Sequence, residues 1–256
     1  MECGIQVSSF RPVLKTAQQV ETAFARLKGM GCRTVQLQWI DPEVPIPDIR
    51  KSMERQELRS VSVQEIYEDF RKDPEYFIRL NRETGGTILC VSRIPQDRMD
   101  PEGLSRFTGE LSRLSVRLKN EGMRLCFHPV RADYRLIGGT AAFELLLREL
   151  PEMELCLDLR HCFLSGRSLP GMLRKYEGRV RMVHFKDGVL CADGSDRLCP
   201  LGEGDTDWTG AVQACMETGV TYLFAEQEQW EGDPFDALQK SLEWLQRETA
   251  ALYPET

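Results

Sequence analysis

Short apolar runs alternate with longer amphipathic segments along the whole chain. Eight runs of six to eight residues have the length and the apolar character of buried strands. They span residues 4–9, 33–40, 58–63, 87–92, 123–130, 154–159, 180–185 and 221–226. The segments between them carry many charges and repeat their apolar residues at helical spacing. The pattern therefore predicts eight strands that alternate with helices.

The segment TAQQVETAFARLKGMG illustrates the helical signals. Val20, Phe24 and Leu27 recur at steps of three and four residues. Thr16 is a suitable N-cap and Gly31 a suitable residue after the last turn. The same signals recur over residues 100–122, where Asp100 is the expected N-cap and Pro101 lies in the first turn.

Eight strand and helix repeats, with strands too apolar to face water, predict a closed parallel (β/α)8 TIM barrel. No Pro, Gly or Ser-rich linker divides the chain, so we expect one domain over residues 1–256. No GxGxxG motif follows the first strand, which weakens a dinucleotide-binding alternative. Residues 41–48, 93–100 and 187–207 are expected to be irregular loops after the second, fourth and seventh strands.

Composition and charge exclude several classes of protein. A net charge of −7 and the absence of a basic block argue against a nucleic-acid partner. No apolar run reaches the roughly 18 residues of a membrane helix, so no membrane partner is expected. The nine cysteines are scattered without a CxxC pair, which suits a reducing compartment and a cytoplasmic protein. Homo-oligomerisation is left open.

Polar residues close the last four predicted strands. The ends of parallel barrel strands build the active site in this fold. The residues found there are His128 on the fifth strand, Asp158 and His161 on the sixth, His184, Lys186 and Asp187 on the seventh, and Glu226, Gln227 and Glu228 on the eighth. All three histidines of the chain thus fall on one rim, beside carboxylates that are costly to bury. We expect a shared site there.

Two imidazoles and two carboxylates, one from each of four neighbouring strands, form a mixed nitrogen and oxygen donor set. His128, Asp158, His184 and Glu226 are therefore candidate ligands of one divalent cation. Such a set suits Mn²⁺, Co²⁺, Zn²⁺ or Fe²⁺ better than a metal that prefers thiolates. A bound cation would polarise a substrate oxygen and stabilise negative charge that develops there.

Four stretches resemble signatures of a known family. They are LDLRH at 157–161, GRVRMVHFKD at 178–187, GEGDTDW at 202–208 and FAEQEQW at 224–230. Together the chain resembles the sugar phosphate isomerase/epimerase family, also called the xylose isomerase-like TIM barrels, over essentially its whole length. HFKD followed some twenty residues later by GEGDTDW is the most specific part of the resemblance.

The resemblance implies roles for the rim residues. Asp158, His184 and Glu226 would ligate a divalent cation, while Lys186 and His161 would face the oxygens of the substrate. Mn²⁺ is the favoured ion, with Co²⁺, Zn²⁺, Fe²⁺ and Mg²⁺ as alternatives. The implied substrate is a small sugar, keto-sugar or polyol.

The fifth strand departs from the family pattern. Many members carry a Glu there as fourth ligand and second base, whereas this chain reads FHPVRADYR, with Val130 and Asp133 in place of the second His and the Glu. His128 remains as the ligand. Two-base epimerisation needs a carboxylate on each face of the substrate carbon, so this departure puts it in doubt.

The resulting hypothesis is proton abstraction next to a carbonyl by Glu226, with Lys186 and His161 as the other catalytic residues and the metal stabilising an enediolate. Isomerisation or epimerisation is the first interpretation, and β-elimination by a lyase or dehydratase on the same site is the alternative. A third is a carbohydrate-binding barrel without turnover. A three-metal endonuclease of the same superfamily would need more histidines and a basic groove.

Further rim residues have less definite roles. Glu203 and Gln38 are candidates for substrate contact, and Gln36 is expected to point into the barrel as Gln38 does. Trp208 is expected at the barrel mouth, as core or as a wall for a sugar ring. Asp207 is expected to be the N-cap of the seventh helix. Glu65 is expected to be a loop or capping residue.

Overall fold

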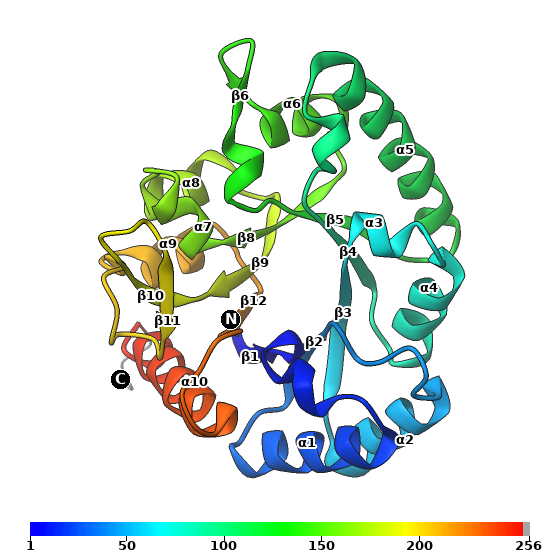
Figure 1. The fold of residues 1–256 in the computed structure, drawn as a ribbon, viewed down its shortest axis with the longest axis vertical. Coiled ribbons are helices and arrows are strands. Elements are labelled where there is room, and N and C mark those ends of the chain that lie inside the picture. Colours follow the sequence, from blue (N-terminus) through cyan, green and yellow to red (C-terminus); the bar gives the residue numbers. More distant parts are fainter. Residues whose placement is uncertain (253–256) are drawn as a thin grey trace.

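The strands close into a single parallel barrel. In this computed structural model, which describes residues 1–252, the strand order is β1-β12-β9-β8-β5-β4-β3-β2 (Figure 1). The strands are β1 Glu2–Gln6, β2 Thr34–Leu37, β3 Arg59–Ile66, β4 Ile88–Ser92, β5 Arg124–His128, β8 Glu154–Asp158, β9 Val180–Phe185 and β12 Tyr222–Ala225. Each lies within or beside one of the eight predicted runs. The predicted (β/α)8 TIM barrel is confirmed.

Helices surround the barrel and connect its strands. They are α1 Ala17–Gly29, α2 Ile46–Gln56, α3 Tyr67–Phe70, α4 Pro74–Glu83, α5 Pro101–Asn120, α6 Ala142–Glu149, α7 Leu159–Leu164, α8 Leu169–Lys175, α9 Ala211–Glu217 and α10 Pro234–Ala250, with 3-10 turns η1 Val7–Val13, η2 Gln96–Arg98 and η3 Arg131–Tyr134. Thr16 and Asp100 cap α1 and α5, by accepting from the amides of Gln19 (3.2 Å) and Gly103 (2.8 Å), as predicted.

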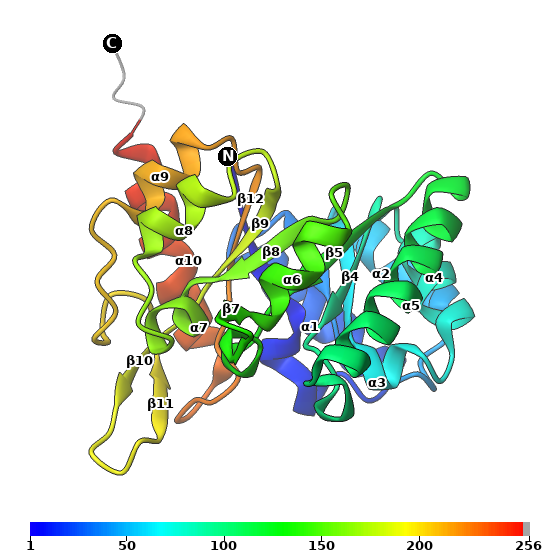
Figure 2. The same ribbon diagram turned by 90° about the horizontal axis from the view of Figure 1, so that it is seen from above.

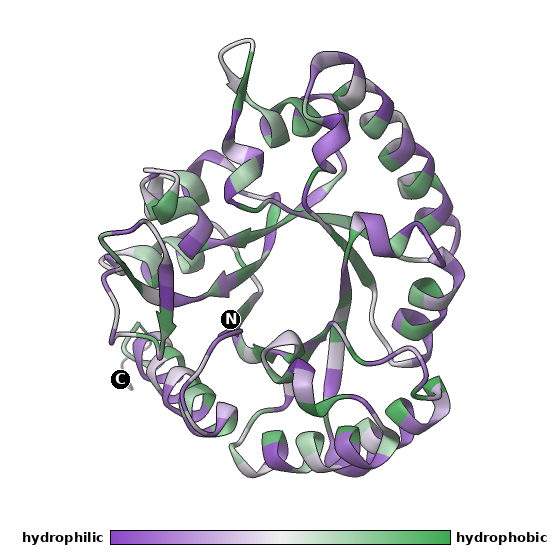
Figure 3. Ribbon diagram, viewed as in Figure 1, coloured by the Kyte–Doolittle hydropathy of each residue, from purple (hydrophilic) through white to green (hydrophobic). Residues whose placement is uncertain are grey.

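The core has two layers. The larger lies between strands and helices, and its largest side chains include Phe10, Phe24, Phe107 and Phe143, all fully buried. A smaller cluster fills the barrel itself: Val61, Ile88, Cys90, Cys126, Cys156, Met182 and Phe224. Figure 3 shows hydrophilic and hydrophobic stretches on the outer helices, while the strands are largely hydrophobic. No disulfide links any of the nine cysteines, all of which lie in residues 1–252.

A hairpin stands on the carboxyl face of the barrel, where residues 187–207 were expected to be irregular. β10, Asp187–Leu190, pairs antiparallel with β11, Asp196–Cys199, and Figure 2 shows the pair projecting from the barrel. Arg160 anchors the hairpin near its turn, because the buried guanidinium contacts Asp196, which pairs with Leu190, at 2.5 and 3.1 Å and also bonds Asp205. A second, smaller hairpin joins β6 Leu136–Ile137 to β7 Thr140–Ala141.

None of the helices in residues 1–252 combines the length and the apolar character that crossing a bilayer requires.

Candidate metal centre

All three histidines meet at the carboxyl end of the barrel, as predicted. The ring centroid of His128 lies 4.7 Å from that of His184 and 6.1 Å from that of His161. His128 is the last residue of β5, His184 is the residue before the last of β9, and His161 lies in the first turn of α7, directly after β8. Parallel strands in one register bring these ends together: β8 and β9 place Asp158 opposite His184.

Each of the four expected ligands has one polar atom held by a neighbour. The bonds are Ser92 Oγ with His128 Nδ1 (3.1 Å), His161 N with Asp158 Oδ1 (2.9 Å), Gln36 Oε1 with His184 Nε2 (2.6 Å) and Ser8 Oγ with Glu226 Oε1 (2.9 Å). Such partners orient a ligand and set which atom it presents. The orientation of all four side chains is therefore determined by the protein.

The second polar atom of each ligand is buried and makes no hydrogen bond, although Asp158 Oδ2 and Glu226 Oε2 lie within ion-pair distance of Lys186. These atoms are His128 Nε2, Asp158 Oδ2, His184 Nδ1 and Glu226 Oε2. Ligand atoms of His128, Asp158 and His184 lie within 4.8 Å of one another, and Glu226 Oε2 is 2.9 Å from His184 Nδ1. Unpartnered buried polar atoms are costly and rare in folded proteins. The group of His128, Asp158 and His184, with Glu226 beside His184, offers nitrogen and oxygen atoms that fit a divalent cation.

Lys186 brings a positive charge to the same oxygens. Its Nζ lies 3.4 Å from Asp158 Oδ2, 3.2 Å from Glu226 Oε2 and 3.0 Å from Glu228 Oε2. The alternation of the strand places Lys186 on the same side as His184, with Phe185 between them facing the outer core. A buried ammonium among three carboxylates is paired, so its charge is retained.

Burial and neighbouring charges set the ionisation of these groups. Burial, together with repulsion from His184, lowers the pKa of His128 to about 3, so that its ring is neutral. Burial opposes the charged forms of Asp158 and Glu226, but the surrounding cations, Lys186 among them, hold the pKa of each carboxyl below its usual range. Burial opposes a charge on Lys186, yet Glu226, Asp158 and Glu228 raise its pKa well above the usual value. The carboxylates and the ammonium therefore remain ionised.

The centre opens to solvent on one side. The side chains of Asp158 and His184 are fully buried, whereas those of His161 and Glu228 are 25% and 34% exposed. His161 and Glu228 are therefore the most exposed of these four residues.

Glu203 and Trp208 lie outside this cluster. Glu203 is half exposed and contacts Lys240 at 3.4 Å. The Trp208 indole stacks on the outer-core ring of Phe185 with a centroid distance of 5.2 Å, which corresponds to the core alternative expected for it rather than to a wall for a sugar ring. The reason is Asp187, whose carboxylate accepts from Trp208 Nε1 at 3.0 Å and from backbone amides of the GEGDTDW loop.

Two capping expectations are resolved differently by the structure. Asp207 does not cap α9, because that helix begins after Gly210, which has a left-handed φ of 72°. Asp207 instead accepts a local bond from the amide of Thr209 at 2.9 Å. Glu65 belongs to β3, and its carboxylate accepts from its neighbour's amide at 2.8 Å and from Trp39 Nε1 at 3.2 Å.

Asp133, which replaces the family's fifth-strand Glu in sequence, does not reach the centre. Its carboxylate accepts from the amides of Ile94 (3.0 Å) and Val130 (2.8 Å) and thereby joins two loops. Burial raises its pKa to about 7, against the opposing effect of these two bonds. His128 is thus the β5 residue that faces the other ligands.

Sequence reasoning missed the residues that orient the ligands, apart from the inward position of Gln36. Gln36 and Gln38 do point into the barrel, where Gln38 Oε1 accepts from Gln6 and Gln64 at 3.1 Å each. The roles of Ser8 and Ser92 were not foreseen. The available signal was that both stand at predicted strand ends, at the same level as the ligands.

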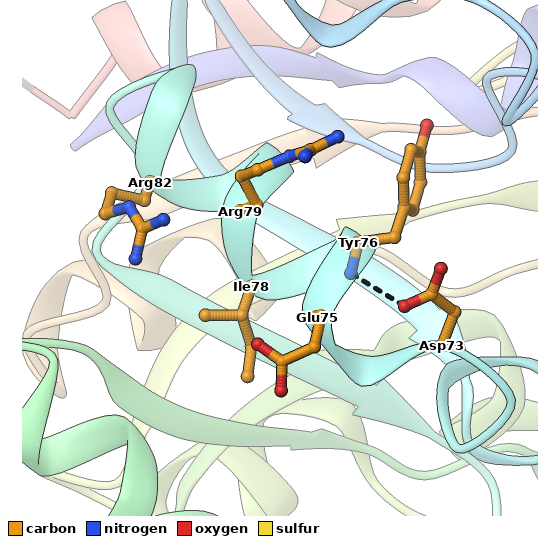
Figure 4. Close-up of a pocket in the computed structure, with 6 residues that line it drawn as sticks. All are labelled: Asp73, Glu75, Tyr76, Ile78, Arg79 and Arg82. Atoms are coloured by element: carbon orange, nitrogen blue, oxygen red, sulfur yellow. Dashed lines mark hydrogen bonds between the residues drawn. The ribbon is translucent and has the colours of Figure 1, made fainter.

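A pocket elsewhere on the described part of the chain is not lined by any of the four expected ligands. A pocket of about 330 Å³ lies along α4 (Figure 4), where Asp73 accepts from the amide of Tyr76. Its charges are already paired, Glu75 with Arg117 at 2.6 Å and Arg82 with Glu121 at 3.1 Å. The pocket along α4 therefore offers no comparable chemistry.

Comparison with known proteins agrees with this architecture. A family model described as xylose isomerase-like TIM barrel matches residues 15–248. A sugar phosphate isomerase/epimerase from Parabacteroides distasonis has a similar structure, with 17% identity, TM-score 0.78, and coverage of 95% of this chain and 93% of that one. A D-allulose 3-epimerase from Methylomonas sp., in complex with D-allulose, shows 15% identity, TM-score 0.76 and 96% coverage of both chains.

A probable 3-DHS dehydratase from Bacillus anthracis also shares the fold, with 13% identity, TM-score 0.73, and coverage of 96% of this chain and 99% of that one. At these identities the likeness shows the fold alone. Comparison with curated protein sequences gave no match.

Proposed function

Because this chain belongs to the xylose isomerase-like TIM barrel family, we propose that it is a divalent-metal-dependent isomerase or epimerase of a small sugar, keto-sugar or polyol. One observation carries this proposal. His128, Asp158, His184 and Glu226 each have one atom held by the protein and one buried atom without a hydrogen bond. Ligand atoms of the first three lie within 4.8 Å of one another, and Glu226 Oε2 lies 2.9 Å from His184 Nδ1. Structural neighbours named as sugar epimerases support the substrate class.

The proposed cation is Mn²⁺, held by these four residues. When bound, a divalent cation supplies Lewis-acid polarisation of a substrate oxygen. Glu226 is the proposed proton acceptor, and Ser8 keeps one of its oxygens oriented. Lys186 and His161 are the proposed substrate-facing residues, because the ammonium stabilises negative charge and the imidazole lies on the open side.

A specific observation keeps β-elimination as a second candidate. Return of a proton to the opposite face of a carbon needs a second base, and the β5 residue at the centre is His128, whose proposed role is that of a ligand. Asp133 is bound to two backbone amides and is not available either. A lyase or dehydratase needs one base and a leaving group. The probable dehydratase among the structural neighbours supports the same candidate.

Metal analysis is the first test. Purified protein loaded with Mn²⁺ is expected to retain about one equivalent, and Asp158→Ala and His184→Ala should retain little. The loaded protein is then incubated with keto-sugars and inososes in D₂O, where incorporation of deuterium next to the carbonyl reports proton abstraction. Incorporation with loss of water would identify the dehydratase. Metal binding without exchange across the panel would favour a binding barrel without turnover, and absence of metal binding would refute the proposal.

We also propose a cytoplasmic location, supported by the nine free thiols, six of them buried.

A further inference from the structure

A hydrogen-bonded chain of buried glutamines ends on His184. Gln36 is fully buried, and its Oε1 lies 2.6 Å from His184 Nε2 and accepts from Gln6 Nε2 at 2.9 Å. Gln6 is likewise fully buried. An amide oxygen can only accept hydrogen bonds, whereas an imidazole nitrogen either donates or accepts. The direction in which the Gln36 amide faces therefore decides which nitrogen of His184 carries the proton.

Backbone groups fix this direction from both ends. At one end the amide of Ser8, which can only donate, bonds to Gln6 Oε1, so that Gln6 turns its Nε2 toward Gln36. At the other end Ser62 donates its hydroxyl proton to the carbonyl of Val63, and therefore accepts from Gln36 Nε2 at 3.3 Å. Both constraints place Gln36 Oε1 against His184, which must present Nε2–H.

The hydrogen bond with Gln36 and the neighbouring carboxylate of Glu226 favour a proton on different nitrogens of His184. Glu226 Oε2 lies 2.9 Å from His184 Nδ1 and favours a proton on that nitrogen. A proton on Nδ1 would occupy the atom that faces the other ligands. With the proton held on Nε2, the Nδ1 lone pair is available to a cation, and a metal ligand must offer such a lone pair.

We propose that Gln36, oriented by Gln6 and Ser62, is the positioning residue that selects the metal-binding tautomer of His184. This inference rests on the proposed metal centre and adds to it a hydrogen-bond chain that sets the protonation of one ligand. Ser8 takes part in this arrangement twice, because its backbone amide orients the glutamines and its hydroxyl orients Glu226. Loss of an outer partner of a metal-bound histidine commonly weakens metal affinity by about 10-fold to 100-fold.

The test compares Gln36→Met with Gln64→Met. Met keeps the length of the side chain but lacks the acceptor. Gln64 is also buried in the barrel and bonds to Gln38, so its variant controls for loss of a buried amide. Mn²⁺ affinity is measured by calorimetry, and circular dichroism confirms folding. We expect Gln36→Met to bind Mn²⁺ about 10-fold to 100-fold more weakly than wild type, and Gln64→Met to stay within about threefold.

A second readout needs no metal. The chain has three histidines, so ¹⁵N–¹H spectra of the metal-free, ¹⁵N-histidine-labelled protein can be assigned by single substitutions. Burial opposes a charge on the His184 ring, but Cys156 and Glu226 raise its pKa well above the usual value, so the spectra are recorded at a pH above that pKa. There we expect the remaining His184 proton on Nε2 in wild type and Gln64→Met, and on Nδ1 or shared in Gln36→Met. Should Gln36→Met fail to fold, Gln36→Glu replaces it, which keeps an acceptor and should retain the Nε2 proton.

The outcomes separate the two proposals. Wild-type protein that binds no Mn²⁺ refutes the metal centre, while the tautomer spectra still decide the role of Gln36. Wild-type protein that binds Mn²⁺, with a Gln36→Met variant of equal affinity and unchanged His184 spectrum, refutes the positioning role alone. Loss of the Nε2 proton in Gln36→Glu would also overturn it.

Discussion

The carboxyl group of Glu65 is expected to make stability depend on pH. Its side chain is buried at the end of β3, and burial raises its pKa from 4.5 to about 7, although the bonds from the Ile66 amide and from Trp39 oppose this change. The folded protein thus prefers the neutral form, while the unfolded chain ionises near 4.5. Stability from this group is fully present below pH 4.5 and is lost as pH rises toward 7.

The size of the effect follows from the two pKa values. Their difference corresponds to about 3 kcal/mol at most, lost at about 1.4 kcal/mol per pH unit. Glu65→Gln keeps the acceptor for Trp39 but cannot ionise. Urea unfolding of both proteins, with EDTA present, should give free energies whose difference is constant below pH 4.5. The difference should then grow in favour of the variant up to about pH 7 and level off. Parallel profiles across that range would refute the reasoning.

Three further changes test other contacts. Ser8→Ala removes the hydrogen bond that orients Glu226 and should weaken Mn²⁺ binding about tenfold in calorimetry, because hydrogen bonds to charged groups contribute about 1.5 to 3 kcal/mol. An unchanged Mn²⁺ affinity would contradict this role of Ser8. Arg160→Met leaves two aspartates unpaired and should lower the unfolding free energy by about 2 to 3 kcal/mol, with faster proteolysis in residues 187–199. Phe10→Ala removes a fully buried ring stacked on Phe235 and should cost about 3 to 5 kcal/mol in urea unfolding; a loss below 1 kcal/mol would show that the site collapses.

The barrel and the meeting of the His, Asp and Glu side chains at its rim could be predicted because both depend on local patterns. Strand and helix periodicities are read over short windows, and in a parallel barrel every strand end lies on the same face. His128, Asp158 and His184 were therefore found from their positions at strand ends. Ser8 and Ser92 also stand at predicted strand ends, but a serine there does not by its residue type indicate a metal site, so position alone did not single them out. Ser92 reaches His128 only because β4 and β5 pair in register, and that register is a property of the folded sheet.

Contacts with residues distant in sequence explain where the structure departs from the expectations. Residues 187–207 are rich in Gly and Asp, which suggests irregular structure, but buried Arg160 anchors the turn end of the hairpin through Asp196. Trp208 was left open as core or as a wall for a sugar ring, and it takes the core role because Asp187 accepts its indole N–H and the ring stacks on Phe185. Both cases involve partners 20 to 40 residues apart in sequence, which a local window does not cover.

The closure of the barrel has a consequence for the order of assembly during synthesis. β1 pairs with β12, and the bond between Ser8 and Glu226 spans 218 positions of the chain. A ribosome makes β1 first and β12 last among the strands, and domains generally fold as they emerge. The oriented ligand set is therefore complete only after the last strand has left the ribosome and closed the barrel. A nascent chain that lacks β12 would therefore not bind a metal ion in this arrangement. Binding of a cation there would require the completely synthesised and closed barrel.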